Sequence, residues 1–266
     1  MILGIVLASG DSFKNMSKSG QDKLFKDFYL KMFSKSFDKV YVFSYLKEEV
    51  DNLPKNVFII SNALNIHKYF YNILMPFIQY RYFKKVHVIR TYHLFGIIPA
   101  VISRVFFGKK FIFNYAYDYF AFAKISRNYI QMIFFTVLMI LMGFAAKIFV
   151  ANKNHLSKFP KSKIVYLPNG ADTSFFKPKK NSSSSNAILS VGRLTKQKNF
   201  ESLIHAMKGI KAKLLIVGQG ELKKKLLMLA KANKVSVGII GPVSHNQMPK
   251  FYQKADIFVS SSLIEG

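Results

Sequence analysis

The stretch that ends at Asn199 constrains the fold of this chain more than any other. Residues 187–191 form a short, mostly apolar run bounded by turn-forming residues, which predicts a buried parallel strand. Gly192 ends this strand, and Asn199 is expected to cap an amphipathic helix that follows. Arg193 and Lys198 lie on the turn between them, where the strand end and the helix N-terminus favour a bound anion. Taken alone, the turn has an alternative interpretation as a solvated basic loop.

Two further stretches lie before and after this one. The first is Tyr166-Leu167-Pro168-Asn169-Gly170-Ala171-Asp172-Thr173-Ser174-Phe175-Phe176-Lys177-Pro178. The second begins with Gly241-Pro242-Val243-Ser244-His245 and closes with Ser260-Ser261-Ser262-Leu263-Ile264-Glu265-Gly266. In order and spacing, the three stretches resemble the donor-binding half of glycosyltransferase family 4, the retaining GT-B enzymes that use nucleotide-diphosphate sugars. The resemblance extends over nearly the whole chain.

The resemblance implies roles for residues of the second half. Arg193 and Lys198 would act as catalytic cations that bind the donor diphosphate and stabilise it as it leaves. Glu265 matches the first glutamate of a paired motif that holds the sugar. The other implied substrate-binding positions in this half are Gly192, Gly218, Gly220 and Val243. Although Gly218-x-Gly220 invites a dinucleotide interpretation, Lys223 replaces the third small residue, so the Rossmann fingerprint fails.

The first half would face the acceptor. Asp118 follows a strand, where the family has a His-Asp pair, and it is a candidate base or acceptor-positioning group; an ordinary helix N-cap is the alternative. Tyr117 replaces the histidine of that pair, which puts a histidine-based mechanism in doubt. His93 is a second candidate for substrate binding, with a structural histidine as the alternative. Gly20 is the nearest match to the family's glycine loop, and a plain flexible loop is its alternative.

Alternating short apolar strands and helices predict an α/β protein with parallel sheets covered on both faces. We expect two Rossmann-like domains in the GT-B arrangement, the second of them incomplete. The acceptor-side domain would span residues 1–167 and the nucleotide-sugar domain residues 168–266. The polar stretch 181–186 is expected to be a surface loop between them.

The charge of the sequence bears on its partners. It has 40 Lys and Arg against 13 Asp and Glu, a formal charge of +27. The charge is spread over both halves and is almost all lysine, which argues against sequence-specific nucleic-acid binding. A lysine-rich surface suits an anionic membrane, and a compositional bias toward lysine is the alternative. No spacing of His, Asp or Glu suggests a metal, and we expect no cofactor besides the sugar donor.

Residues 130–146 form the longest apolar stretch. A membrane-spanning helix needs about 20 apolar residues, so a buried or surface-lying helix is favoured here. We therefore expect a cytoplasmic protein attached peripherally to the inner face of the plasma membrane.

The predicted activity is metal-independent transfer of a sugar, with retention, to a glycan or lipid-linked acceptor. Family members continue beyond the position of Glu265, so we expect a truncated and inactive chain, with Glu265 on a frayed end. The alternative is a non-catalytic remnant that binds a membrane surface or a nucleotide sugar.

Overall fold

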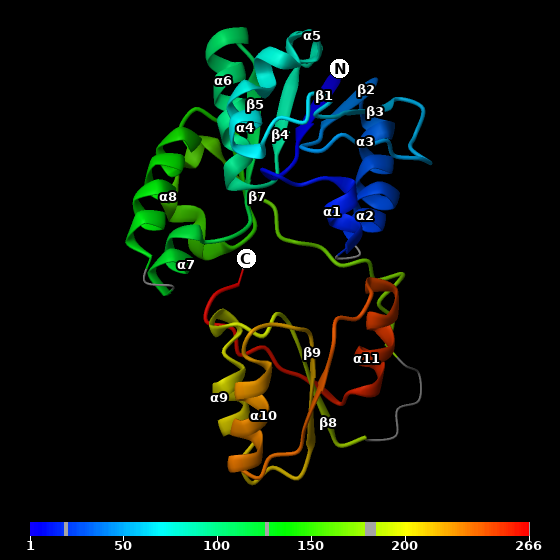
Figure 1. The fold of residues 1–266 in the computed structure, drawn as a ribbon, viewed down its shortest axis with the longest axis vertical. Coiled ribbons are helices and arrows are strands. Elements are labelled where there is room, and N and C mark those ends of the chain that lie inside the picture. The colour runs from blue at the N-terminus through cyan, green and yellow to red at the C-terminus, as the bar shows by residue number, and fades with distance from the viewer. Residues whose placement is uncertain (19–20, 126–127, 179–184, 266) are drawn as a thin grey trace. The chain divides into compact units, whose positions relative to one another are not determined.

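A computed structural model describes residues 1–18, 21–125, 128–178 and 185–265 of the chain. Its contacts divide these residues into two units, Met1–Asn169 and Gly170–Glu265 (Figure 1). The first unit holds a seven-stranded sheet in the order β3-β2-β1-β4-β5-β6-β7. The second holds a four-stranded sheet in the order β10-β9-β8-β11. Neighbouring strands are parallel throughout both sheets, as the sequence predicts.

The strands of the first sheet are β1 Ile2–Val6, β2 Lys39–Phe43, β3 Val57–Ile60, β4 Val88–Thr91, β5 Lys110–Tyr115, β6 Lys147–Val150 and β7 Ile164–Tyr166. The helices of this unit are α1 Phe13–Lys18, α2 Gln21–Leu24, α3 Lys31–Ser36, α4 Lys68–Ile78, α5 Tyr80–Lys85, α6 Ile97–Phe107, α7 Tyr119–Ile125 and α8 Tyr129–Met142. Short helical turns are η1 Phe25–Leu30, η2 Leu94–Gly96, η3 Lys153–Lys158 and η4 Lys161–Lys163. Strand β7 has no counterpart among the strands expected from the sequence.

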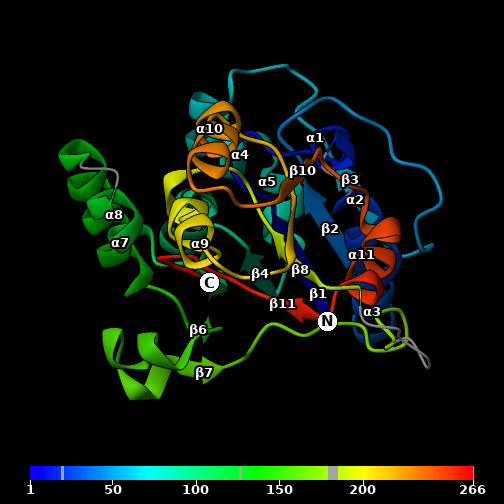
Figure 2. The same cartoon turned by 90° about the horizontal axis from the view of Figure 1, so that it is seen from below.

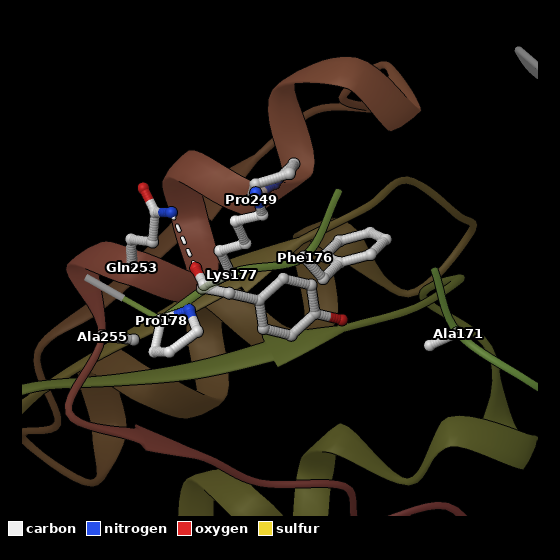
Figure 3. A pocket seen from close by; sticks show the side chains of 8 residues that line it. Ala171, Phe176, Lys177, Pro178, Pro249, Gln253 and Ala255 are labelled. Atoms are coloured by element: carbon white, nitrogen blue, oxygen red, sulfur yellow. Dashed lines mark hydrogen bonds between the residues drawn. The ribbon is translucent and has the colours of Figure 1, made fainter. Parts of the chain in front are cut away.

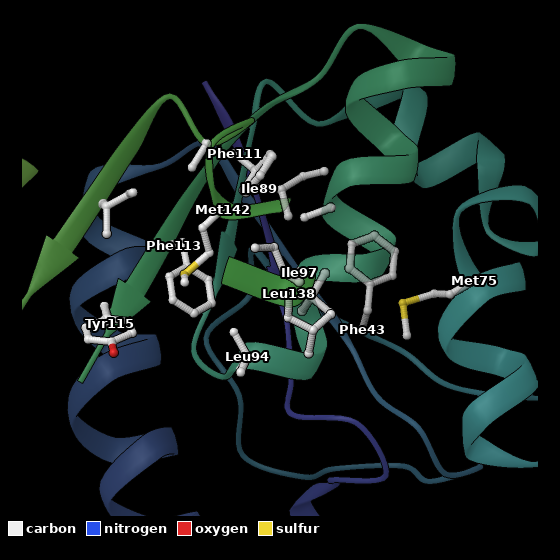
Figure 4. Close-up of a cluster of buried hydrophobic side chains, with 14 of the residues drawn as sticks. Phe43, Met75, Ile89, Leu94, Ile97, Phe111, Phe113, Tyr115, Leu138 and Met142 are labelled. Carbon is white, nitrogen blue, oxygen red and sulfur yellow. The ribbon is translucent and has the colours of Figure 1, made fainter. Parts of the chain in front are cut away.

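Two buried clusters cover the two faces of the first sheet. On one face, strand residues such as Phe43 and Phe113 pack against Met75 of α4 and Met142 of α8 (Figure 4). On the other face, Leu3 and Val42 pack against Phe25 and Leu30 of η1. Apolar strands buried on both sides explain why the strand sequences read as continuous apolar runs.

The segment after the first strand departs from the expected regular helix. Apolar residues recur at helical spacing from Leu24 to Met32, yet both of those side chains are exposed. The chain forms a π-helical turn, η1, and buries Phe25 and Leu30, which are five positions apart. The wider π turn brings residues at i and i+5 to the same face, so the buried stripe shifts from the α-helical one.

The second unit follows the order expected from its sequence. Its strands are β8 Ala187–Val191, β9 Lys213–Val217, β10 Val237–Ile240 and β11 Ile257–Phe258. Its helices and turns are η5 Lys196–Lys198, α9 Phe200–Ala206, α10 Lys223–Ala232, η6 His245–Gln247 and α11 Met248–Lys254. The fourth strand, β11, pairs with the first, β8, through Ile257–Ile188 and Phe258–Leu189.

One helix start differs from the prediction. Asn199 has a left-handed backbone with φ of 51°, and its side chain makes no capping hydrogen bond to the backbone of α9. Its Oδ1 accepts a hydrogen bond from the Ser202 hydroxyl instead, at 2.9 Å. The left-handed conformation, which Asn tolerates, turns the chain from η5 into α9. The predicted apolar face of α9 is confirmed, because Phe200, Leu203 and Ile204 are buried.

Candidate functional site

The carboxyl ends of the second sheet gather most of the residues selected from the sequence. All four strands are parallel, so the turns that follow them meet at one edge. Strand β8 lies between β9 and β11, and the chain reaches β11 only after passing through β9 and β10. The order of strands therefore reverses between β8 and β11. In open α/β sheets, ligands bind in the crevice at such a reversal.

Glycines bring two of these turns into backbone contact. Gly218 has φ of +150°, and a Cβ on it would lie 1.9 Å from the carbonyl oxygen of Gly192. A Cβ on Gly220 would lie 2.5 Å from the carbonyl oxygen of Leu194. The amide of Leu194 donates to the carbonyl of Gln219 at 2.9 Å. A side chain at either glycine would push the β8 and β9 turns apart, so both positions require glycine for packing.

Lys198 is positioned by the same turn. Its aliphatic stem packs over Gly192, where an added Cβ would come within 3.1 Å of the Lys198 Cδ. Its Nζ donates to Glu265 Oε1 at 2.6 Å, and the side chains of Lys198 and Glu265 are 19% and 50% exposed. Two residues that are 67 positions apart in sequence are thus paired at the strand reversal.

The segment that carries Glu265 is anchored rather than frayed, which corrects the expectation from the sequence. The amide of Leu263 donates to the carbonyl of Gln197 at 2.9 Å. The Gln197 side chain in turn donates to the carbonyl of Ile264 at 3.0 Å. The Ser261 hydroxyl donates to the carbonyl of Lys198 at 2.8 Å. These bonds tie residues 261–265 to η5, so the position of Glu265 depends on tertiary contacts that the sequence pattern does not reveal.

The surroundings of Glu265 favour its ionised form. Burial by itself raises the pKa of this carboxyl. Hydrogen bonds from Lys198, Ser262 and Ser260 and the charge of Lys198 have the opposite and larger effect, so the pKa of Glu265 lies below its ordinary value. A carboxylate fixed in this way can accept hydrogen bonds from hydroxyl groups of a ligand. The Lys198 ammonium beside it keeps donors for an anion.

Arg193 and Val243 differ in how they relate to this pair. Arg193 is exposed on the same turn as Lys198, and its guanidinium makes no hydrogen bond or ion pair with the residues that the structure describes. Val243 is half-buried in the loop after β10, at the far edge of the sheet from β11. Among the described residues, no hydrogen bond joins Val243 to Lys198 or Glu265. The geometry thus groups Arg193, Lys198 and Glu265, and leaves Val243 apart.

In the first unit, Asp118 is enclosed by partners. Its Oδ1 accepts from the amide of Ala121 at 3.1 Å, which makes Asp118 the N-cap of α7. Lys158 donates to Oδ2, and His155 Nε2 lies 3.5 Å from the same oxygen. Burial raises the pKa of Asp118, but the hydrogen bonds from Lys158 and the Ala121 amide and the nearby charges outweigh it and lower the pKa. The alternative role as a helix cap is the one that this geometry favours, while a catalytic role for Asp118 stays a prediction.

His93 lies at the carboxyl end of the first sheet, after β4. Its Nδ1 lies 3.2 Å from the Tyr119 hydroxyl at the start of α7. The surrounding protein shields the ring in part and lowers the pKa of His93, while the Asp11 carboxylate opposes that shift. Asp11 follows β1, so loops after β1, β4 and β5 meet here. Gly20, the third predicted residue of this unit, lies outside the described residues.

A hollow of about 650 Å³ in the second unit lies apart from the predicted residues. Phe176, Tyr252, Pro178 and Pro249 line it, and Gln253 donates to the carbonyl of Lys177 at 2.8 Å across it (Figure 3). None of Arg193, Lys198 and Glu265 contributes to its lining. No group of three His, Asp or Glu side chains within the described ranges is placed to hold a metal ion.

Three residues that shape these sites were not selected from the sequence. Gln197 is buried, with an exposed fraction of 6%, and holds the Glu265 segment. Lys158 and His155 enclose Asp118 from 40 and 37 positions away. For Gln197, the sequence offered one signal, which is its position directly before the candidate residue Lys198. For Lys158 and His155 we find no sequence signal, because their partner lies on another element.

Comparisons with known proteins assign the second unit. Residues 172–266 match the family model described as glycosyl transferases group 1. Over 81 residues the chain is 40% identical to the N-acetylgalactosamine-N,N'-diacetylbacillosaminyl-diphospho-undecaprenol 4-alpha-N-acetylgalactosaminyltransferase of Campylobacter jejuni, covering 30% of this chain and 22% of that protein. Over 86 residues it is 37% identical to the amylovoran biosynthesis glycosyltransferase AmsD of Erwinia amylovora, covering 30% of this chain and 24% of AmsD. The matched segments thus span less than a quarter of those relatives.

Solved structures resemble the described chain over nearly all of its length. The structure of sucrose-phosphate synthase from Thermosynechococcus elongatus matches with a TM-score of 0.74 and 16% identity. The match covers 98% of this chain and 75% of the synthase chain. Anabaena HepE in complex with UDP-glucose matches with a TM-score of 0.64 and 14% identity, and the match covers 98% of this chain and 74% of the HepE chain. At such identities the likeness shows the fold alone.

The fold of the chain is therefore that of the GT-B glycosyltransferases, with Rossmann-like parallel sheets. Its second unit is a group 1 glycosyl transferase domain. The glycosyltransferase family predicted from the three stretches is confirmed for the second unit by this match, and the two relatives are glycosyltransferases as well.

Proposed function

We propose that the protein carrying this chain transfers a sugar from a nucleotide-diphosphate sugar, without a metal ion and with retention of the anomeric configuration. The observation that carries the proposal is the Lys198–Glu265 pair at the strand reversal of the second sheet, beside the exposed Arg193. The match of this unit to the glycosyl transferases group 1 supports it. Complexes of Anabaena HepE with UDP and with UDP-glucose support a nucleotide-sugar donor.

The charges of the three side chains would give them different roles in binding the donor. Arg193 and Lys198 supply cations for the diphosphate, and negative charge grows on that group as the bond to the sugar breaks. A cation fixed before the reaction stabilises this charge without a reorganisation cost. Glu265 accepts hydrogen bonds from sugar hydroxyls, and its ion pair with Lys198 holds both groups in place until the donor binds.

The acceptor is proposed to be a glycan or a lipid-linked glycan. The name of the Campylobacter jejuni relative describes a diphospho-undecaprenol acceptor, and that of the Erwinia amylovora relative describes polysaccharide biosynthesis. His93, at the carboxyl end of the first sheet, is the residue we favour for contact with the acceptor. We place the protein in the cytoplasm at an anionic membrane surface, because a lipid-linked acceptor and a charge of +27 both favour that surface.

Replacing the two cations separately tests the roles. Lys198→Ala should weaken UDP binding, measured by calorimetry, by roughly 10-fold or more, because a charge-assisted hydrogen bond to the diphosphate is lost. In the full-length protein that carries this chain, Arg193→Ala should reduce turnover by ~10²–10³ while weakening UDP binding less, since its effect grows with the leaving-group charge. Turnover is measured as nucleotide release from a panel of UDP- and GDP-sugars with undecaprenyl-diphosphate-linked acceptors.

Lys196→Ala is the matched control, because Lys196 is an exposed lysine of the same turn with no assigned role. Equal losses in Lys196→Ala and Arg193→Ala would refute the assignment. UDP binding by the full-length protein without turnover in any sugar–acceptor combination would favour the non-catalytic nucleotide-sugar-binding protein. That residues 1–266 alone lack turnover stays a prediction, and the same assay on the purified chain tests it.

A further inference from the structure

Helix α8 is apolar around most of its circumference, with Gln131 and Thr136 as exposed polar residues, although only one side is buried. Phe135, Leu138 and Met142 face the core. The opposite side carries Ile130, Ile133, Val137 and Ile140, with exposed fractions of 82%, 69%, 50% and 67%. A surface helix of a water-soluble protein normally turns charged or polar residues outward. The outward side of α8 is instead suited to an apolar environment.

Neighbouring helices extend this surface. Helices α4, α6 and α8 lie along the same side of the first unit (Figure 1). Phe77 of α4 contacts Phe106 of α6 with ring centroids 5.1 Å apart, and Phe95, just before α6, contacts Phe134 of α8 at 5.5 Å. We call the exposed apolar side chains of these three helices the apolar face; besides those of α8 it includes Phe70, Ile73, Val105 and Phe106.

Basic residues predominate in the part of the chain that holds the apolar face. Residues 52–171 contain 16 Lys and Arg and a single acidic residue, Asp118. That carboxylate is buried and paired with Lys158, so it neutralises one lysine and leaves the charges of the other basic residues uncompensated within this stretch. Lys68 of α4, Arg104 of α6 and Lys124 of α7 are exposed, and the Lys68 Nζ lies 5.2 Å from the centre of the Tyr69 ring. Apolar side chains bordered by cations match the acyl and headgroup layers of an anionic bilayer.

We propose that the apolar face inserts into the headgroup region of an anionic phospholipid bilayer, with α8 lying parallel to the membrane plane. The inference deepens the membrane location given in the proposed function and rests on that location, not on transferase activity. Helix α8 has 14 residues, about 21 Å at 1.5 Å per residue, which is shorter than the ~30 Å hydrocarbon core. None of the helices in the described ranges is long and apolar enough to cross a membrane. A second copy of this chain is disfavoured as the occupant, because it would bring like charges together.

Vesicle co-sedimentation tests the insertion. The chain should bind vesicles of phosphatidylglycerol and phosphatidylcholine, and part of that binding should persist at high salt. Combining Ile130→Gln, Ile133→Gln and Ile140→Gln leaves the net charge unchanged and should weaken binding by roughly 100-fold or more through lost apolar burial. The matched control combines Leu227→Gln and Met228→Gln, which alter exposed apolar residues of α10 in the second unit. This control should bind like the parent chain.

Fluorescence gives a second measurement that does not depend on a loss of binding. The chain has no tryptophan, so Ile133→Trp introduces a single fluorophore on α8. Its emission should shift to shorter wavelength on adding the same vesicles, whereas that of Met228→Trp should not shift. Equal binding by the triple-Gln variant and the parent would overturn the inference. So would a lipid-free dimer that the triple-Gln variant abolishes, because the face would then bind a second copy. UDP calorimetry on the same variants reports separately on the proposed function.

Discussion

The two units each hold a carboxylate paired with a lysine, and the two pairs differ in what remains available. Asp118 in the first unit has a side chain that is only 13% exposed, and its oxygens are used by Lys158, the Ala121 amide and the Tyr115 hydroxyl. The Glu265 side chain in the second unit is 50% exposed, and it accepts hydrogen bonds from Lys198, Ser262 and Ser260. The first pair joins α7 to η3 and is saturated with protein partners. The half-exposed carboxylate of the second pair can still accept hydrogen bonds from a ligand, which is the role proposed for it.

The largest effect should come from the backbone contact that shapes the second site. Gly218→Ala places a methyl group against the Gly192 carbonyl at a φ that disfavours a side chain. We expect the second unit to lose about 3 kcal/mol or more, from backbone strain and overpacking together. Hydrogen exchange of peptides from β8 and β9 measures this, with peptides of the first unit as an internal reference. Gly241→Ala is the control, since no atom lies within 4 Å of the added methyl group. Similar losses at both positions would show that contact with Gly192 does not limit stability.

Substitution of the two carboxylates tests the comparison directly. Asp118→Ala removes the cap of α7 and the charged partner of Lys158, which should cost about 2–4 kcal/mol of local stability. Glu265→Gln removes a half-exposed pair and should cost less than about 1 kcal/mol. Hydrogen exchange of α7 and of residues 260–265 measures the two effects, and UDP-sugar titration measures binding. A larger loss of stability from Glu265→Gln than from Asp118→Ala would reverse the proposed division of roles.

The smallest expected effect is a dependence of stability on pH in the first unit. The folded-state pKa of Asp118 is lowered, so its stabilisation is present above the unfolded pKa of about 3.9. That stabilisation is lost as the pH falls through the lower folded value. Burial and the Lys158 charge lower the pKa of His155, although Asp118 opposes the shift. The folded state therefore resists protonation of His155, and stability falls as the pH drops below about 6.5.

His155→Asn should reduce the loss of stability between about pH 7 and pH 5, and Asp118→Asn should reduce the loss below about pH 4. Exchange of α7 peptides across this range gives the measurement. His93 and Asp11 also titrate in this unit, so each variant is compared with the parent at the same pH. Parallel curves for parent and variants would contradict the assigned pKa shifts.

The sequence by itself determined the elements and the class of fold. Short apolar runs such as residues 2–6 form strands covered on both faces of a parallel sheet, and their length and spacing of apolar residues distinguish them from helices such as α6. It also selected Arg193 and Lys198, because they lie on the turn after a buried strand, and Glu265, through the resemblance of its stretch to a glycosyltransferase motif.

Only the tertiary structure decided how those residues are held. Gln197 anchors the Glu265 segment through bonds between residues that are 66 or more positions apart, and no local pattern records such pairings. The π turn at η1 and the left-handed Asn199 likewise follow from packing, which overrides local preference. The exposed side of α8 belongs here too. Its apolar sequence predicted a helix, but which residues face outward depended on where the sheet and α6 cover it.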